Sequence, residues 1–350
     1  MKIMQIGHKT IGTDHKPFVI AEMSGNHNQS LDRALAIVKA AADAGADAIK
    51  LQTYTADTMT IKAKHGLFHI NDEASLWKGQ SLYELYQLAY TPWEWHKEIF
   101  DYAKSLGLLG FSSPFDDTAV DFLEELNVPA YKVASFENTD HPLLKKIAQT
   151  GKPVIMSTGV SKLADIDESV RVLRENGCKE LALLKCTSTY PASPETTNIL
   201  TIPHMAQLFE QVVIGLSDHT MGIGVPVAAV ALGARIIEKH FTLNRADGGV
   251  DSQFSLEPEE LKSLVIESER AFLGLGKVQY GIQKSEKDSK RFKRSIYVVQ
   301  DVEAGKAFNI DNLRIIRPGD GMPPKYLAKI LGKVASTKIE AGTPLQWAHF

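Results

Sequence analysis

Residues 212–241 read VVIGLSDHTMGIGVPVAAVALGARIIEKHF, and this stretch decides the fold. Two apolar runs, 212–217 and 234–241, flank an alanine-rich segment that is long enough for one helix. A strand, a crossover helix and a second strand form a unit whose two strands lie parallel. Each run leads into a histidine, His219 after the first and His240 in the second. We therefore expect the two imidazoles to lie close together at the carboxyl ends of neighbouring strands.

The same alternation of strand and helix patterns extends from residue 18 to about residue 276. Eight runs have the composition of buried strands: 18–24, 48–54, 108–113, 130–135, 153–158, 181–187, 212–217 and 234–241. Eight consecutive strand and helix units predict a (β/α)8 TIM barrel. The alternative is a doubly wound open sheet, which usually has fewer strands. It also begins with a glycine-rich phosphate turn, which AEMSGNHN at 21–28 does not supply.

One connection of the expected barrel, residues 55–107, is much longer than the others. An insertion after a barrel strand lies at the catalytic face and commonly shapes access to the site. We expect most of its aromatic rings, including Trp93 and Trp95, to pack the helix that ends near Leu106.

The chain changes character after Gly276. Residues 281–295 are polar and charged, and the residues that follow are β-rich without a crossover helix pattern. A weak repeat, DVEAGKAF at 301–308 and KIEAGTPL at 338–345, suggests two hairpin-like units. We expect a catalytic barrel with an N-terminal extension over 1–280, a linker over 281–290 and a small C-terminal β domain over 291–350. A domain of this size is marginally stable alone.

The composition excludes several classes of protein. The chain has 350 residues, 44% of them hydrophobic, which is ample for one large core. A formal charge of −3 without a long basic run predicts no nucleic-acid and no membrane partner. Cys178 and Cys186 are the only cysteines, which argues against a disulfide framework and for a reducing compartment. No segment has the pattern of a signal peptide or a membrane span, so we expect a cytoplasmic protein.

The reactive groups of a (β/α)8 barrel come from the carboxyl ends of its strands. Here these ends supply mainly lysines, hydroxyls, amides and carboxylates: Glu22, Asn26, Lys50, Gln52, Ser113, Phe115, Lys132, Ser135, Ser157, Thr158, Lys185, Ser188, Tyr190, Ser217, His219, Glu238 and His240. Ammonium groups and hydroxyls that converge on one mouth suit an anionic ligand such as a phosphate or a carboxylate. Each lysine considered alone is better explained as the partner in a structural ion pair. The prediction of an anionic ligand therefore depends on several lysines lying together at one mouth.

The paired histidines suit a divalent metal. Two neutral imidazoles leave most of the coordination sphere of Mn²⁺ or Mg²⁺ open for water and substrate oxygen. Alternation along the last strand places Glu238 on the same face as His240, which makes it a candidate supporting partner. Glu22 is the candidate for proton transfer. The alternatives are a hydrogen-bonded structural role for each histidine and an ordinary buried acid at Glu22.

These residues together resemble the sialic acid synthase family, whose members condense phosphoenolpyruvate with an N-acetylated sugar. The resemblance covers essentially the whole chain, in the family's order: AEMSGNHN, GADAIKLQTYT, SSPFD, VPAYKVASFE, PVIMSTG, LLKCTSTYP, GLSDHT, EKHFT and RPGDG. From about Ser289 the tail is similar to the family's antifreeze-like domain. Within the family, SLYELYQLAYTPWEWH and FLEELNVPAYKVASFE are most similar to the branch that makes pseudaminic acid. That branch uses a 2,4-diacetamido-2,4,6-trideoxy-altrose instead of N-acetylmannosamine.

The resemblance implies a role for each matching residue. His219 and His240 become the ligands of Mn²⁺ or Mg²⁺, and Glu22 becomes the acid/base residue. Phosphoenolpyruvate is held by Lys50, Lys132, Ser135, Ser157, Ser217 and Ser188, the last standing where some sialic acid synthases have asparagine. The sugar is contacted by Gln52, Phe115, Tyr190 and Asp251. The resemblance also implies a domain-swapped homodimer, in which Arg317 of RPGDG reaches an acetamido group in the active site of the partner subunit.

Other functions are open on the residues alone. One is an N-acetylneuraminate or legionaminate synthase. Another is a lysine-dependent aldolase on the same barrel, in which Lys132 or Lys185 forms a Schiff base. A third is a non-catalytic sugar-phosphate binding protein, for which the charged mouth suffices but the paired histidines have no role.

Overall fold

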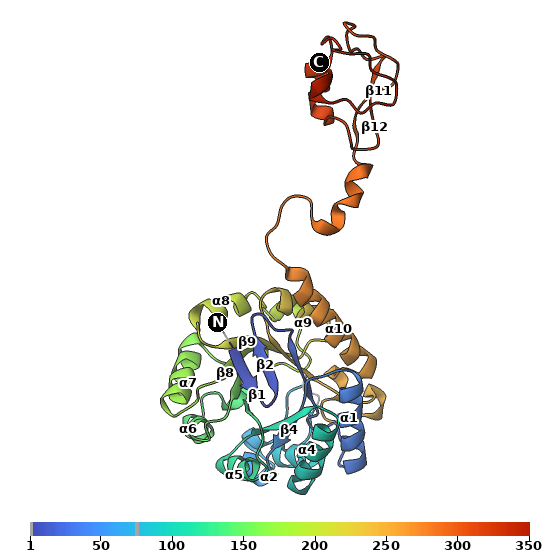
Figure 1. Cartoon of the computed structure of the whole chain (residues 1–350). Coiled ribbons are helices and arrows are strands. Elements are labelled where there is room, and N and C mark those ends of the chain that lie inside the picture. Colours follow the sequence, from blue (N-terminus) through green and yellow to red (C-terminus); the bar gives the residue numbers. More distant parts are fainter. Residues whose placement is uncertain (1–2, 74–76) are drawn as a thin grey trace. The chain divides into compact units, whose positions relative to one another are not determined.

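The structure, a computed structural model, describes residues 3–73 and 77–350. The chain divides into two compact units, residues 1–276 and 277–350. In the first unit eight parallel strands close into a barrel in the order β10-β3-β4-β5-β6-β7-β8-β9, surrounded by helices (Figure 1). The strands are β3 (Phe18–Glu22), β4 (Ala48–Thr53), β5 (Leu109–Pro114), β6 (Tyr131–Val133), β7 (Val154–Ser157), β8 (Leu181–Cys186), β9 (Val213–Asp218) and β10 (Ile236–His240). The (β/α)8 prediction is confirmed, and each predicted run overlaps one strand.

The helices of this unit are amphipathic where they cover the barrel. In α1, Ala34, Ile37, Val38 and Ala41 form the buried face, and Ser30 caps the helix by accepting a hydrogen bond from the Arg33 backbone. The strands β3, β9 and β10 are buried at every position, as expected for parallel strands packed on both faces. The other helices are α2 (Ala56–Met59), α3 (Leu82–Ala89), α4 (His96–Ser105), α5 (Asp117–Glu125), α6 (His141–Gln149), α7 (Leu163–Glu175), α8 (Thr201–Leu208), α9 (Gly224–Ala231) and α10 (Pro258–Leu275), with α1 spanning Leu31–Asp43.

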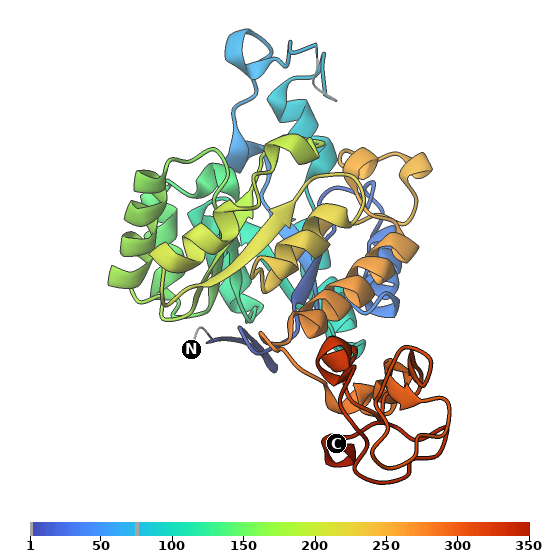
Figure 2. The same ribbon diagram turned by 90° about the horizontal axis from the view of Figure 1, so that it is seen from above.

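A short hairpin covers the end of the barrel at which the strands begin. It pairs β1 (Ile3–Ile6) with β2 (Lys9–Gly12) in antiparallel register and buries Met4, Ile6 and Ile11. Its backbone and side chains bond to residues just before strands, for example Lys9 to Asp47 at 2.8 Å. Figure 2 shows the hairpin and the described part of the insertion between β4 and β5 at opposite ends of the barrel. The insertion therefore lies at the carboxyl ends of the strands, where the sequence places it.

Two aromatic rings of the insertion make contacts other than the expected packing on the helix that ends near Leu106. Trp93 stacks on Phe122 of α5 with ring centroids 4.7 Å apart. Trp77 instead lies 6.3 Å from the ring of Tyr190, and its indole nitrogen donates to the Val250 carbonyl oxygen at 3.0 Å. Trp77 therefore belongs to the wall of the barrel mouth.

The second unit has its own small apolar core, which includes Ile296, Phe308, Ile330 and Leu345. It contains the antiparallel pair β11 (Ser295–Val298) and β12 (Leu313–Ile316) and one short helix, α11 (Leu327–Ile330). The two copies of the sequence repeat pair with each other, because Val302 and Ile339 exchange backbone hydrogen bonds at 2.9 Å. Residues 281–290, the expected linker, are exposed. Within residues 3–73 and 77–350, no helix combines the length and apolar character that a membrane span requires.

Candidate active site

The two histidines meet as the sequence predicts. Strands β9 and β10 pair in parallel with Asp218 opposite Lys239, so the following residues, His219 and His240, lie side by side. Their ring centroids are 5.4 Å apart. The His219 Nδ1 lies 3.0 Å from the Thr187 carbonyl oxygen, which can only accept, so Nδ1 carries the proton and Nε2 is left as a ligand atom.

His240 is buried in a way that keeps its imidazole neutral. Burial lowers the pKa of His240 well below its usual value. Its buried Nδ1 has no hydrogen-bond partner in the described structure, and the nearest carboxylate atom, Asp251 Oδ2, is 3.7 Å away. A buried neutral imidazole with an unpaired nitrogen is a suitable metal ligand.

The pair of imidazoles fits an open metal site better than a closed one. Across residues 3–73 and 77–350, no group of three or more His, Cys, Asp and Glu side chains is arranged to hold a metal ion. Two nitrogen ligands leave the remaining positions of a divalent ion to water and substrate, which suits Lewis-acid chemistry. The residues present therefore fit a metal that is shared with the substrate.

Four buried charges form the floor of the mouth. Lys50 Nζ lies 2.7 Å from Glu22 Oε2 and 3.7 Å from Glu238 Oε2, and Lys132 Nζ lies 3.7 Å from Glu238 Oε1. All four side chains are at most 6% exposed. Although burial opposes it, the charges of Lys132 and Lys50 lower the pKa of Glu238. The cluster thus places two ammonium groups and one firmly ionised carboxylate beneath the histidines.

Glu22 differs from Glu238 in its electrostatics. Burial raises the pKa of Glu22 to about 7, with Lys50 opposing the rise and the Glu238 charge adding to it. A carboxyl group with a pKa near neutrality exists in both protonation states at working pH, which is the property of an acid/base residue. The structure gives Glu238 the partners Ser217, at 2.9 Å, Lys50 and Lys132 rather than a role beside His240.

Hydroxyl groups line the same mouth. Lys132 Nζ donates to Ser157 Oγ at 2.7 Å, and Ser217 donates to Glu238. Ser135 accepts a hydrogen bond from the Gly159 backbone at 3.1 Å. A Cβ at Gly159 would lie 2.2 Å from Ser188 Oγ and 2.7 Å from Ser135 Oγ, so only glycine lets these two hydroxyls approach. Ser157 and Ser217 therefore contact the buried charges directly, while Ser135 and Ser188 meet each other beside Gly159.

Four of the predicted sugar-contact residues lie in the barrel unit, and the fifth lies in the second unit. Gln52 donates to Glu22 Oε1 at 2.9 Å, and Tyr190 has its ring centroid 4.5 Å from that of His219. Asp251 approaches His240, as described above, and Phe115 packs edge-on against Tyr54 at 5.2 Å. Arg317 belongs to the second unit and is exposed there.

Several residues of the mouth escape sequence reasoning. Ser24 lies between Gln52 and Asp251, Gly159 separates two hydroxyls, and Phe254 packs on His240 with centroids 4.9 Å apart. Ser24 belongs to the motif AEMSGNHN and Gly159 to the motif PVIMSTG, whereas Phe254 belongs to none of the motifs that the sequence singles out. The contacts of all three depend on the path of loops that have no strand or helix pattern.

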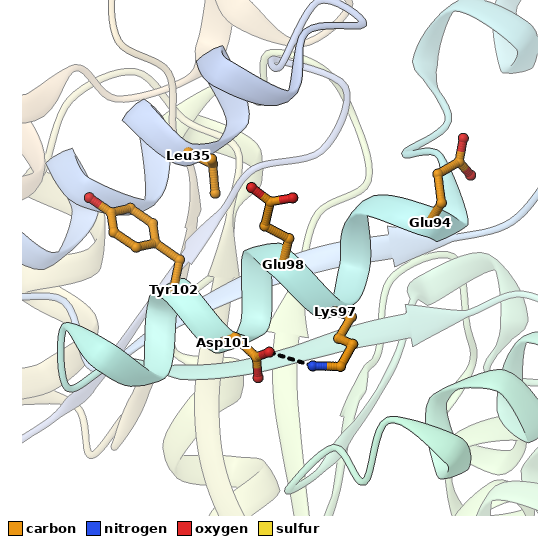
Figure 3. A pocket seen from close by; sticks show the side chains of 6 residues that line it. All are labelled: Leu35, Glu94, Lys97, Glu98, Asp101 and Tyr102. Carbon is orange, nitrogen blue, oxygen red and sulfur yellow. Dashed lines mark hydrogen bonds and ion pairs between the residues drawn. The ribbon is translucent and has the colours of Figure 1, made fainter.

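A hollow on the outside of the barrel is separate from this mouth. It has a volume of about 540 Å³ and lies between α1 and α4, lined by Leu35, Glu94, Lys97, Glu98, Asp101 and Tyr102 (Figure 3). Its acidic side chains are partly compensated by the ion pair of Lys97 with Asp101 at 2.6 Å. None of its lining residues belongs to the predicted site.

The closed barrel, the paired histidines and the second unit have a counterpart among known families. Residues 37–280 match the NeuB family, and residues 293–350 match the SAF domain. The chain belongs to the NeuB family. This membership confirms the resemblance to sialic acid synthases that the motifs carry.

Relatives of this NeuB-family chain extend over nearly its full length. It is 42% identical over 347 residues to the pseudaminic acid synthase of Campylobacter jejuni, covering 99% of this chain and 100% of that protein. It is 38% identical to the N,N'-diacetyllegionaminic acid synthase of the same species, covering 92% and 96% of the two chains. The crystal structure of N-acetylneuraminic acid synthetase from Leptospira borgpetersenii superposes with a TM-score of 0.73. The two chains are 32% identical, and 82% of this chain and 94% of that chain are covered.

Proposed function

We propose that this NeuB-family chain is a pseudaminic acid synthase. It condenses phosphoenolpyruvate with 2,4-diacetamido-2,4,6-trideoxy-L-altrose and water, and releases pseudaminate and phosphate by C–O cleavage. The observation that carries the reaction type is the buried cluster of Glu22, Lys50, Glu238 and Lys132 beneath two adjacent imidazoles. The choice of sugar is supported by the 42% identity to a pseudaminic acid synthase.

The lysines and hydroxyls bind phosphoenolpyruvate. Lys50 and Lys132 neutralise its carboxylate and phosphate charges, and Ser135, Ser157, Ser188 and Ser217 hydrogen-bond the oxygens. Both ammonium groups are buried, so their attraction for an anion is screened less than at a surface. Bound in this way, the ligand's C3 faces the sugar aldehyde.

Each bond that forms is balanced by one that breaks. The π electrons of phosphoenolpyruvate form the bond from C3 to the aldehyde carbon, and the aldehyde oxygen takes up a proton. Cationic character then develops at C2, which the Glu238 carboxylate and the ligand's own negative charges stabilise. Water adds its oxygen to C2 and loses one proton. The C2–O bond to phosphate then breaks with its electron pair leaving on phosphate, while the remaining proton of the added hydroxyl is released and C2 becomes a carbonyl.

Glu22 moves the proton in this scheme. Its pKa of about 7 lets it first supply the proton that the aldehyde oxygen takes up and then accept one from the attacking water. Gln52 donates to Glu22 Oε1 and so holds the carboxyl group in place. His219 and His240 would hold Mn²⁺ or Mg²⁺, which when bound polarises the aldehyde carbonyl.

The sugar and the working assembly complete the proposal. Gln52, Phe115, Tyr190 and Asp251 contact the sugar within the barrel, and Arg317 reaches an acetamido group from the second unit of the partner chain. The enzyme is accordingly a domain-swapped homodimer with domains bounded near 280 and 290. The proposal places the enzyme in the cytoplasm.

The deciding experiment measures phosphate release from phosphoenolpyruvate with Mn²⁺, with and without EDTA. Three sugars are compared: the diacetamido-altrose, its legionaminic counterpart and N-acetylmannosamine. We expect EDTA-sensitive release with the altrose sugar only. Release with another sugar would reassign the protein to legionaminate or N-acetylneuraminate synthesis, and no release with any sugar would overturn the proposal.

A lysine-dependent aldolase is the second candidate function. Burial lowers the pKa of Lys132, and a lysine with a lowered pKa is more readily neutral and able to form a Schiff base. Borohydride with pyruvate inactivates such an enzyme, whereas EDTA does not. Inactivation by borohydride, together with resistance to EDTA, would favour this candidate over the synthase.

A further inference from the structure

Ser24 has a backbone conformation that its side chain disfavours. It lies two residues beyond Glu22, is 2% exposed, and has a φ of 48°. This left-handed region is uncommon for residues other than glycine, and buried residues held there occur often at functional sites. Glycine would adopt the same backbone without steric cost. The presence of serine instead of glycine at this position therefore indicates that the hydroxyl group has a role.

The hydroxyl of Ser24 joins two side chains that come from distant parts of the chain. It accepts a hydrogen bond from the Gln52 amide nitrogen at 3.3 Å and donates one to Asp251 Oδ2. The same Gln52 nitrogen donates to Glu22 Oε1. A continuous path of hydrogen bonds thus runs from Asp251, in the loop after β10, through Ser24 and Gln52 to Glu22.

Asp251 has no comparable second support. Its other close polar contact is His240 Nδ1 at 3.7 Å, which is longer than a hydrogen bond. Burial raises the pKa of Asp251, and the hydrogen bond from Ser24 opposes that rise. Without the hydroxyl, the carboxylate can rotate about its own side-chain bonds, and the Gln52 amide loses one of its acceptors.

We propose that Ser24 is a positioning residue of the sugar subsite, whose hydroxyl fixes Asp251 and Gln52 in one orientation toward the sugar. This inference rests on the proposed function, because it assigns both side chains to the sugar. The alternative is a purely structural role for Ser24. The proposal predicts no change in the binding of phosphoenolpyruvate, because the predicted ligands of phosphoenolpyruvate lie around Lys50 and Lys132.

The test uses two variants of the full-length chain, Ser24→Gly and Ser24→Ala. Both remove the hydroxyl, but only glycine relieves the left-handed backbone. The control is Asn127→Gly, which relieves a similar backbone, with a φ of 50°, at an exposed position that follows α5. Phosphate release is measured while the altrose sugar and phosphoenolpyruvate are varied separately, and thermal unfolding is recorded for each variant.

We expect both Ser24 variants to raise the KM for the sugar about tenfold, the usual effect of losing a hydrogen bond to a charged group. The KM for phosphoenolpyruvate stays unchanged. Ser24→Gly unfolds at a temperature no lower than Ser24→Ala, and Asn127→Gly leaves both KM values unchanged. An active Ser24→Gly enzyme with a wild-type KM for the sugar would overturn the inference while leaving the proposed function intact. A parallel rise in both KM values would also overturn it. A wild-type enzyme that releases no phosphate with any sugar would overturn the proposed function and this inference with it.

Discussion

Two groups of buried charges lie on opposite faces of the same barrel wall, and they differ in how completely their hydrogen bonds are satisfied. On the outer face, Lys239 Nζ lies 2.9 Å from Asp218 Oδ2, and the two side chains are 0% and 1% exposed. Asp218 also accepts from the Thr220 backbone and hydroxyl at 3.2 and 2.8 Å. On the inner face, Glu238 Oε2 has no hydrogen bond within the described residues, and Lys50 Nζ lies 3.7 Å from it.

This difference separates a structural ion pair from a binding site. A buried pair with satisfied hydrogen bonds holds its surroundings together, whereas removing one partner leaves an uncompensated charge. Buried carboxylate oxygens without hydrogen bonds are costly unless a ligand completes them. The outer pair therefore fixes the spacing of β9 and β10, and the inner cluster is arranged for a substrate.

The largest effect is expected at His240, which follows Lys239 on β10 but faces the barrel interior. Replacing His240 with alanine should lower phosphate release by about a thousandfold, because half of the proposed metal ligands are lost. His204→Ala, at an exposed histidine on α8, is the matched control and should keep wild-type activity. A His240→Ala enzyme that retains most of its activity would remove the metal assignment.

The next effect concerns the outer pair. Asp218→Asn should reduce the free energy of unfolding by about 3 kcal/mol, because Lys239 is left buried without its countercharge. Urea denaturation measures the loss. The double variant Asp218→Asn with Lys239→Met should recover part of it, since neither charge is then buried. Full additivity of the two single variants would mean that the two side chains do not stabilise each other.

The strands and the histidine pair could be predicted from sequence for the same physical reason. Each of the eight runs is apolar enough to be buried on both faces, and parallel strands of a barrel bring their carboxyl ends to one mouth. The hairpin of β1 and β2 was treated only as an extension, because strands of four residues are too short to show a period.

The remaining details of the site depend on features that no sequence period encodes. Alternation places Glu238 on the inner face, but it does not say that Lys50, Lys132 and Ser217 lie within its reach. The left-handed backbone of Ser24 and the position of Trp77 beside Tyr190 are set by loop packing. Tertiary contacts decide these positions. Sequence reasoning therefore predicted the face of the strand on which Glu238 lies, but it did not predict the side chains that contact Glu238.

The inner cluster should also give the protein a stability that depends on pH near neutrality. The pKa of Glu22, about 7, lies above its ordinary value of 4.5, so the folded state holds the proton more tightly than the unfolded chain. This contribution is full below about pH 4.5 and is lost as the pH rises through 7. Lys50, Glu238 and Gln52 are the groups that face Glu22.

Glu22→Gln removes this titration. Urea denaturation from pH 4.5 to 8, without added metal, should show wild-type stability falling relative to Glu22→Gln over that range. The same urea denaturation series is recorded for Asp218→Asn, which keeps Glu22. It shows whether the pH dependence of stability arises from the inner face. An unchanged difference between the wild type and Glu22→Gln across the range would show that Glu22 has an ordinary pKa.

The smallest effect is expected where the insertion meets the mouth. Trp77→Phe keeps an aromatic ring near Tyr190 but removes the donor to the Val250 carbonyl oxygen, next to Asp251. A neutral hydrogen bond contributes about 1 kcal/mol, so the KM for the sugar should rise about fivefold, with the KM for phosphoenolpyruvate unchanged. Trp93→Phe is the matched control, because its indole also donates to a backbone carbonyl, that of Tyr54, while its ring stacks on α5. If both variants change the two KM values alike, the insertion acts through general stability. If only Trp77→Phe affects the sugar, the insertion supports the inner face through the Asp251 loop, which the outer pair does not require.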